Sequence, residues 1–310
     1  MRDSAEQPQH PSLEQIAAMI SVLGDDHGPL QRSARDQLLV WGGRAVQQLR
    51  EGAEAEHMPT RARCRSLLRS IEVRETVDRL GALRLDSVGA SSAPSLLEGA
   101  LLATRVVRGF VPAASSLAPL LRREAASLKR ACAGRSLSAC RRALVEALHV
   151  KLGLSGCDAE LLDVGHGHLV AELFDTYVQH RELIDRLSID RVLERREGAP
   201  IALCLIYLLV TRWAGLSASG VALPGHFLIR LHGPRPLLID PFHGGRVVTK
   251  SDCVRYLRRN GFDRPGDHLV DLNDREVMTC YLRCLDASVR RADAETREAL
   301  QRSLRLLGSS

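Results

Sequence analysis

The stretch "LPGHFLIRLHGPRPLLIDPFHGG", residues 223–245, decides the fold, because two short apolar runs flank a turn. The first run is "HFLIRL" at 226–231, the second is "PLLID" at 236–240, and a Gly-Pro turn separates them. Side chains alternate between the two faces of a strand, so even-numbered and odd-numbered positions of a run lie on opposite faces. The pattern predicts an antiparallel hairpin.

The two runs carry a histidine at the start of the first and an aspartate at the end of the second. A hairpin that is symmetric about Gly233 places His226 opposite Asp240 and Leu228 opposite Leu238. Directly opposed Cβ atoms are roughly 4.5 to 5.5 Å apart, close enough for a carboxylate to bond an imidazole. The expected contact depends on the register, since a slip of one residue moves the two side chains to opposite faces.

An apolar segment, "APIALCLIYLLV" at 199–210, precedes the hairpin. Gly198 ends one helix and Pro200 fits the first turn of the next, where a missing backbone N–H costs nothing. The helix is expected to reach about Trp213 and, being apolar on nearly all sides, to lie in the core. The run is too short to span a bilayer.

Three motifs around this helix and hairpin carry a family resemblance. They are "REGAPIAL" at 196–203, "PGHFL" at 224–228 and "DPFHGG" at 240–245. The chain resembles the SirB-type branch of the transglutaminase-like superfamily, a bacterial branch, over about residues 95–300. The resemblance implies an α+β fold, mostly helical with a small antiparallel sheet, and a cysteine-protease-like core. It further implies a Cys, His and Asp triad, in which His226 is the base and Asp240 the orienting acid.

The third member of the implied triad has no obvious place. Catalytic relatives carry the cysteine at the N-terminus of the buried helix, where the helix dipole favours a thiolate. Pro200 stands at that point, and Ala202 replaces the branch's frequent Ser or Thr. Cys204 lies one turn further along and on the same helix face as Pro200, so it is either a displaced nucleophile or a small core residue.

The rest of the chain is predicted to be helical. A polar tail at 1–11 precedes a segment at 12–84 in which "QRSARDQLL" and "TRARCRSLL" recur 29 residues apart. This segment resembles a HEAT-type repeat pair, with an ordinary helical bundle as the alternative. A helical region at 95–188, the transglutaminase-like core at 189–272, and a C-terminal helical hairpin at 273–308, tetratricopeptide-like by the resemblance, complete the expected organisation.

Composition narrows the class of protein. The chain has 310 residues, 45% of them hydrophobic, and a net charge of +6. The basic residues are spread along the chain and aromatic residues amount to only 4%, which argues against nucleic-acid binding. The N-terminal residues lack the apolar core of a signal peptide, and eight scattered cysteines favour reduced thiols, so a cytoplasmic protein without a membrane association is expected.

Other candidate ligands in the sequence give no sign of a metal or an organic cofactor. Cys280 and Cys284 are four residues apart in a helical pattern, but no second ligand pair has a matching spacing, so two packed thiols are expected. His166 and His168 stand in a Gly-rich lead-in to a helix. His232 and His243 fall in predicted turns. All four histidines are interpreted as solvated loop residues.

Three functions from different classes remain open. The first, favoured by the missing nucleophile and by the regulatory role suggested for the branch, is a non-catalytic transglutaminase-like protein that binds a protein partner. The second is a thiol acyltransferase or amidase with Cys204 attacking, His226 as base and Asp240 orienting it. The third is a basic scaffold for RNA or another polyanion.

Overall fold

The computed structural model describes residues 11–25, 27–85, 92–157, 177–289 and 293–308. The chain divides into two compact units, Met1–Thr76 and Val77–Ser310, and helix α4 runs across the division. His166 and His168 lie outside the described residues. In the part of the chain described, no helix is both long enough and apolar enough to cross a membrane.

The first unit is helical. Its elements are α1 (Leu13–Leu23), α2 (Gly28–Trp41), a 3-10 turn η1 (Gly42–Ala45), α3 (Val46–Gly52) and the start of α4 (Met58–Gly81). Ser12 and Gln15 form a capping box that satisfies two free N–H groups at the start of α1. The apolar stripes of these helices share a core of their own, which includes Ile16, Leu38 and Leu67. A HEAT-type ancestry for this unit stays a prediction.

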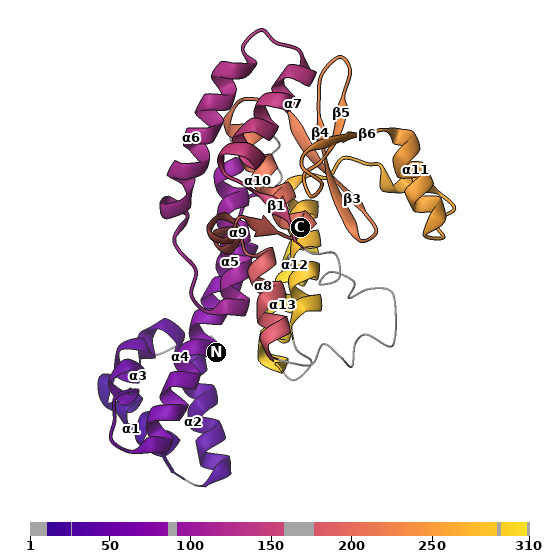
Figure 1. The fold of residues 1–310 in the computed structure, drawn as a ribbon. Helices are drawn as coiled ribbons and strands as arrows, with labels where there is room; N and C mark the ends of the chain where they lie inside the picture. The colour runs from indigo at the N-terminus through magenta and orange to yellow at the C-terminus, as the bar shows by residue number, and fades with distance from the viewer. Residues whose placement is uncertain (1–10, 26, 86–91, 158–176, 290–292, 309–310) are drawn as a thin grey trace, which may run out of the picture. The chain divides into compact units, whose positions relative to one another are not determined.

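The second unit is mostly helical with a small antiparallel sheet, which confirms the predicted fold class (Figure 1). Its elements in chain order are α5 (Ala93–Arg108), α6 (Ala114–Cys132), α7 (Leu137–Val145), the π-helix η2 (Glu146–Lys151), β1 (Ser155–Gly156), α8 (Tyr177–Leu187), α9 (Ile189–Arg195), β2 (Glu197–Gly198), α10 (Pro200–Trp213), β3 (Ala218–Leu223), β4 (His226–Leu231), β5 (Leu237–Asp240), β6 (Arg246–Val248), α11 (Lys250–Arg259), η4 (Pro265–His268), α12 (Asp274–Ser288) and α13 (Ala294–Gly308).

Helix α10 is the centre of this unit and begins at Pro200 and ends at Trp213, as predicted. Its side chains are buried from the first residue through Arg212, because α5, α6 and the sheet pack around it. Arg212 is fully buried and forms an ion pair with Asp274 at the start of α12. Each charge depends on the other, since a lone buried charge would cost several kcal/mol.

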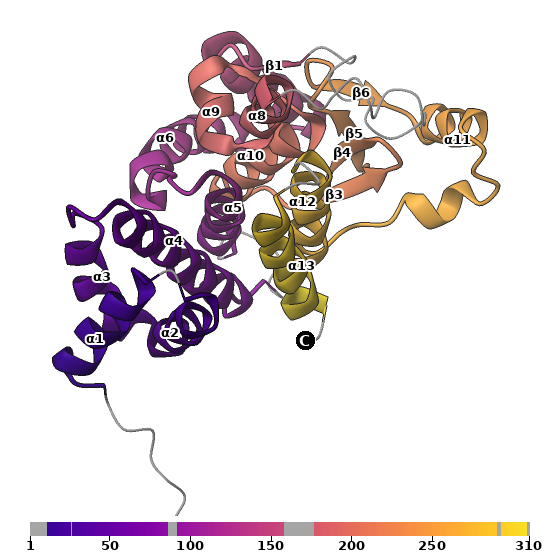
Figure 2. The same ribbon diagram turned by 90° about the horizontal axis from the view of Figure 1, so that it is seen from below.

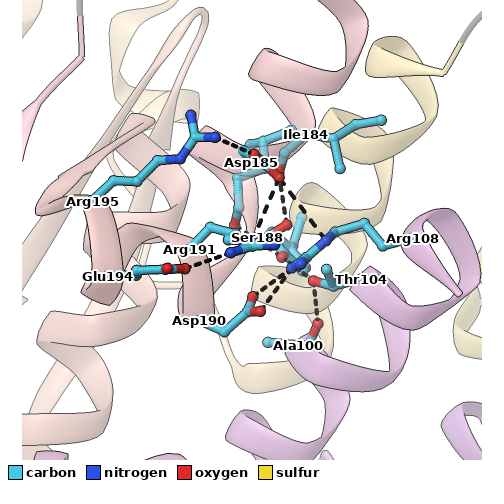
Figure 3. Close-up of polar contacts among 12 residues, drawn as sticks. Ala100, Thr104, Arg108, Ile184, Asp185, Ser188, Asp190, Arg191, Glu194 and Arg195 are labelled. Carbon is cyan, nitrogen blue, oxygen red and sulfur yellow. Dashed lines mark hydrogen bonds and ion pairs between the residues drawn. The ribbon is translucent and has the colours of Figure 1, made fainter. Parts of the chain in front are cut away.

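A second polar cluster ties α5 to the short helices before α10 (Figure 3). Arg108 donates two hydrogen bonds of 2.8 Å to the carboxylate of Asp190 in α9. Arg195 lies 2.7 Å from the carboxylate of Asp185 in α8. Both carboxylates are buried, and the arginines neutralise them in place. This cluster therefore holds the helices that lead into α10.

The sheet is an antiparallel meander in the order β3-β4-β5-β6. The strands β4 and β5 pair Arg230 with Leu238 and Ile229 with Ile239, so the predicted register about Gly233 is wrong by two residues. The predicted register would have placed Pro236 inside the ladder, where proline has no N–H to donate. The strand β5 instead begins after Pro236. A shift of two residues keeps every side chain on its expected face.

The sheet lies between α10 and α11 in both views (Figures 1 and 2). The α10 face carries Gly220 and Ile229, which are cross-strand partners, together with Ile239. A Cβ atom built on Gly220 would lie 3.1 Å from Val277 of α12, so this face packs closely on helices. The α11 face carries a separate apolar cluster in which Val221, Leu223 and Leu228 meet Cys253 and Leu257 of α11.

Candidate functional site

His226 and Asp240 meet on the α11 face of the sheet. His226 opens β4 and Asp240 closes β5, and the imidazole Nε2 donates a hydrogen bond of 3.0 Å to the carboxylate Oδ1. Asp240 is 1% exposed, whereas the side chain of His226 is 17% exposed. Because of the register shift, the two residues are diagonal neighbours and not directly opposed.

His243 joins the same carboxylate from the turn after β5. Its Nδ1 donates to Asp240 Oδ2 at 2.7 Å and its backbone N–H donates to Oδ1 at 3.2 Å. Arg246 lies 3.3 Å from the same Oδ2 atom. The prediction that His243 lies in a turn is confirmed, but its ring contacts Asp240 and is not simply solvated. The side chain is about half exposed, but a glycine-containing turn folds it back onto Asp240.

His232 likewise has partners. Its Nε2 forms a hydrogen bond of 2.9 Å with Ser219 Oγ of β3, and it lies 3.7 Å from the carboxylate of Asp271. The sequence did not indicate strand β3, so the partner of His232 was not foreseen. His232 thus serves to join the hairpin turn to the neighbouring strand.

The charge state of Asp240 follows from its surroundings. Burial opposes ionisation of the carboxyl, but the hydrogen bonds and charges of His226 and His243 outweigh that effect and lower its pKa to about 2. Asp240 is thus an anion at neutral pH. A buried anion that accepts hydrogen bonds from two imidazole rings can orient both of them.

A cavity of about 210 Å3 adjoins this cluster. His226, Asp240 and His243 line it from the hairpin, and Asp252, Cys253 and Tyr256 line it from α11. The thiol of Cys253 is 1% exposed, and burial raises its pKa. The sequence did not indicate that Cys253 lies on the same cavity as His226 and Asp240, because a turn and the strand β6 separate α11 from the hairpin along the chain.

The structure does not bring Cys204 to this cluster. Its thiol is fully buried and donates to the backbone carbonyl of Leu228 at 3.6 Å. A Cβ built on Gly220 would lie 3.8 Å from the sulfur, which places Cys204 on the α10 face. His226 lies on the α11 face, so the sheet separates the thiol from the imidazole. Burial also raises the pKa of Cys204, which disfavours a thiolate.

The first turn of α10 consists of Pro200, Ile201, Ala202 and Leu203, whose side chains carry no nucleophile. This end of the helix faces an apolar cavity of about 440 Å3. Cys280 and Cys284 of α12 line the same cavity, and burial raises the pKa of Cys284 to about 12. Their position agrees with two thiols that pack on one helix face.

The glycines after Asp240 allow a close approach to α10 and to the π-helix η2. Gly245 has a φ of 68°, and a Cβ there would lie 2.5 Å from Tyr207 Oη. Tyr207 donates a hydrogen bond of 2.7 Å to His149 Nε2, since the His149 Nδ1–H donates to Leu154 O. Burial lowers the pKa of His149, which keeps the ring neutral. Packing around Gly245 thus fixes the turn that carries His243.

A family model and several known proteins match parts of this chain. A family model described as transglutaminase-like superfamily matches residues 120–283. A UPF0162 protein of Xylella fastidiosa is 48% identical over 84 residues, which are 26% of this chain and 30% of that protein. A UPF0162 protein of Vibrio cholerae is 38% identical over 71 residues, or 22% of this chain and 26% of that protein.

F-box only protein 21 of Mus musculus is 36% identical over 76 residues, which are 22% of this chain and 12% of that protein. The matches span less than a third of the length of each of these relatives. No solved structure matches the chain. The family model covers more than half of the 310 residues and includes α10 and the whole sheet, so the chain belongs to the transglutaminase-like superfamily.

Proposed function

We propose that this chain is a transglutaminase-like protein of the SirB-type branch that does not use thiol catalysis and acts in regulation by binding a protein partner. The observation that carries the proposal is the separation of Cys204 from His226 by the sheet, together with a first turn of α10 that lacks a nucleophile. A general base must reach the proton that it removes, within about 3.2 Å or through one water.

The retained pair of His226 and Asp240 favours one alternative, an active thiol acyltransferase or amidase that uses Cys204. That mechanism needs a thiolate at neutral pH, whereas full burial of Cys204 raises its pKa. It also needs a path for substrate to a side chain with no exposed surface. Both requirements weigh against the alternative.

The thiol part of the proposal is tested by alkylation of the native full-length chain at neutral pH, with labelling followed cysteine by cysteine. Cys204 is expected to react more slowly than the partly exposed Cys132 and Cys280, and His226→Ala should leave its rate unchanged. His232→Ala serves as the matched control. Rapid labelling of Cys204 that is lost in His226→Ala alone would establish the thiol enzyme.

Support for a binding role comes from the first unit. Helices α1 to α3 and the start of α4 have a core of their own and lie outside the matched residues 120–283. Val40 of α2 is 74% exposed although apolar. A separately packed helical unit that precedes the family core in the chain is a suitable module for contacts with another protein.

A photo-crosslinking residue at Val40 of the full-length chain tests this role in cells. Phe110, between α5 and α6, is similarly exposed at 77% and is the matched control position. The proposal expects one protein to crosslink at Val40, to be absent at Phe110 and to be displaced by an excess of the unlabelled chain. Equal, non-displaceable crosslinking at both positions would count against a specific partner on this unit.

A further inference from the structure

Two imidazoles converge on one buried carboxylate on the α11 face of the sheet. The ligand atoms of His226, Asp240 and His243 all lie within 4.8 Å of one another. We propose that these three side chains form a binding site for a divalent transition-metal ion of the zinc class. This inference goes beyond the proposed function, because it does not depend on whether a thiol reacts or a protein partner binds.

The donor set matches that class of metal. Two imidazole nitrogens and one carboxylate oxygen suit zinc and its neighbours, whereas calcium and magnesium prefer oxygen ligands alone. Metal–ligand bonds of roughly 2.1 Å in a tetrahedral site place ligand atoms about 3.4 Å apart. His226 Nε2 lies 3.0 Å from Asp240 Oδ1 and His243 Nδ1 lies 2.7 Å from Oδ2, and one ligand atom from each residue lies within 4.8 Å of the others, so a rotation of the side chains can bring all three to one ion.

The backbone fixes the three ligands independently. His226 and Asp240 are placed by adjacent strands, and His243 by the turn that Gly244 and Gly245 close with positive φ values. The ring of Phe242 packs edge-on against both imidazoles, with centroid distances of 5.8 Å to His226 and 5.1 Å to His243. Such support limits the rotamers of both ligands before an ion binds.

The cluster has room for a fourth ligand. Three protein ligands with an open position are the usual arrangement of zinc sites that keep a water. The adjoining cavity of about 210 Å3 can hold that water, and Asp252 of α11 lines it as a second carboxylate. The acidic side chains that line the cavity are Asp240 and Asp252, and Arg246 is the arginine that opposes them. With two acids against one arginine, the cavity favours a cation.

A hydrogen-bonded cluster without metal is the competing explanation, and Arg246 distinguishes the two. Its guanidinium lies 3.3 Å from Asp240 Oδ2, the oxygen that His243 also contacts, yet its side chain is 61% exposed. In a purely hydrogen-bonded cluster Arg246 stabilises Asp240. In a metal site Arg246 competes with the ion for the same carboxylate.

The experiment uses the full-length chain stripped with a chelator and titrated with Co2+ and then Zn2+. One Co2+ per chain is expected, with visible absorption typical of nitrogen and oxygen ligands and without the ultraviolet band that a thiolate ligand gives. His243→Ala should weaken binding by at least about 100-fold, more than the loss of an outer partner costs. Arg246→Ala should tighten it several-fold.

Two control variants separate this site from the cysteines and from histidines in general. Cys280→Ser combined with Cys284→Ser, and His232→Ala, should leave the affinity unchanged. The side chain of His243 is about half exposed and that of Arg246 is 61% exposed, so their variants are expected to fold. Binding of Co2+ that disappears with the cysteines, or that is equally strong in His243→Ala, would overturn the proposal.

Discussion

The two faces of the β3-β6 sheet differ more than their shared strands suggest. On the α10 face, Ile229 and Ile239 are fully buried and the thiol of Cys204 points at a backbone carbonyl. On the α11 face, His226 and Asp240 form part of a polar cluster beside a cavity. One face is a packed apolar core, and the other is a partly accessible polar site.

The difference teaches that the face of a strand decides which groups can react together. The side chain of Leu228 lies on the α11 face with His226, while its carbonyl accepts the hydrogen bond of Cys204 from the other side. A thiol can thus lie next to the strand that carries the base and still be separated from it. Nearness along the chain or along one helix is not a sufficient criterion for a triad.

The largest expected effect comes from the α10 face. Ile229→Ala removes a fully buried side chain between the sheet and α10, and should lower the free energy of unfolding by about 3 kcal/mol. Val247→Ala is the matched control, because Val247 points to the same face but is 48% exposed. Urea denaturation measures both. Similar small losses for the two variants would show that this face is not a packed core.

A smaller and pH-dependent effect is expected on the α11 face. The pKa of Asp240 is held at about 2, below its ordinary value, so its contribution is complete above about pH 4 and is lost as the pH falls towards 2. Asp240→Asn should therefore cost about 2 kcal/mol at neutral pH and remove that part of the acid dependence. Urea denaturation at a series of pH values would reveal it. An unchanged acid dependence in the variant would mean that the cluster does not stabilise the fold.

The contrast between the faces was only partly visible in the sequence. The start of α10 at Pro200 and its burial followed from a helix-start residue and an unbroken apolar run. The strand β3 was missed, because "ASGVAL" is rich in small residues that also suit a loop. Gly220 of this strand packs closely on Val277 of α12, a contact between distant residues that local patterns do not carry.

The site was predictable where side-chain alternation alone decided the outcome. The predicted contact between His226 and Asp240 is present although the predicted register was wrong, since a shift of two residues keeps both side chains on the same face. His243 was missed, because its approach to Asp240 requires the positive φ values of Gly244 and Gly245. The catalytic roles of His226, Asp240 and Cys204 stay predictions.

The smallest effect should test whether the two faces are independent. Thr249 and Asp252 form a capping box at the start of α11, the helix that covers only the α11 face. Thr249→Ala removes the cap and should cost about 1 kcal/mol locally, which corresponds to about five-fold faster amide exchange in α11. Amide exchange in α10 should not change, because α10 packs on the other side of the sheet. Equal acceleration in both helices would show instead that the sheet couples its two faces into one cooperative unit.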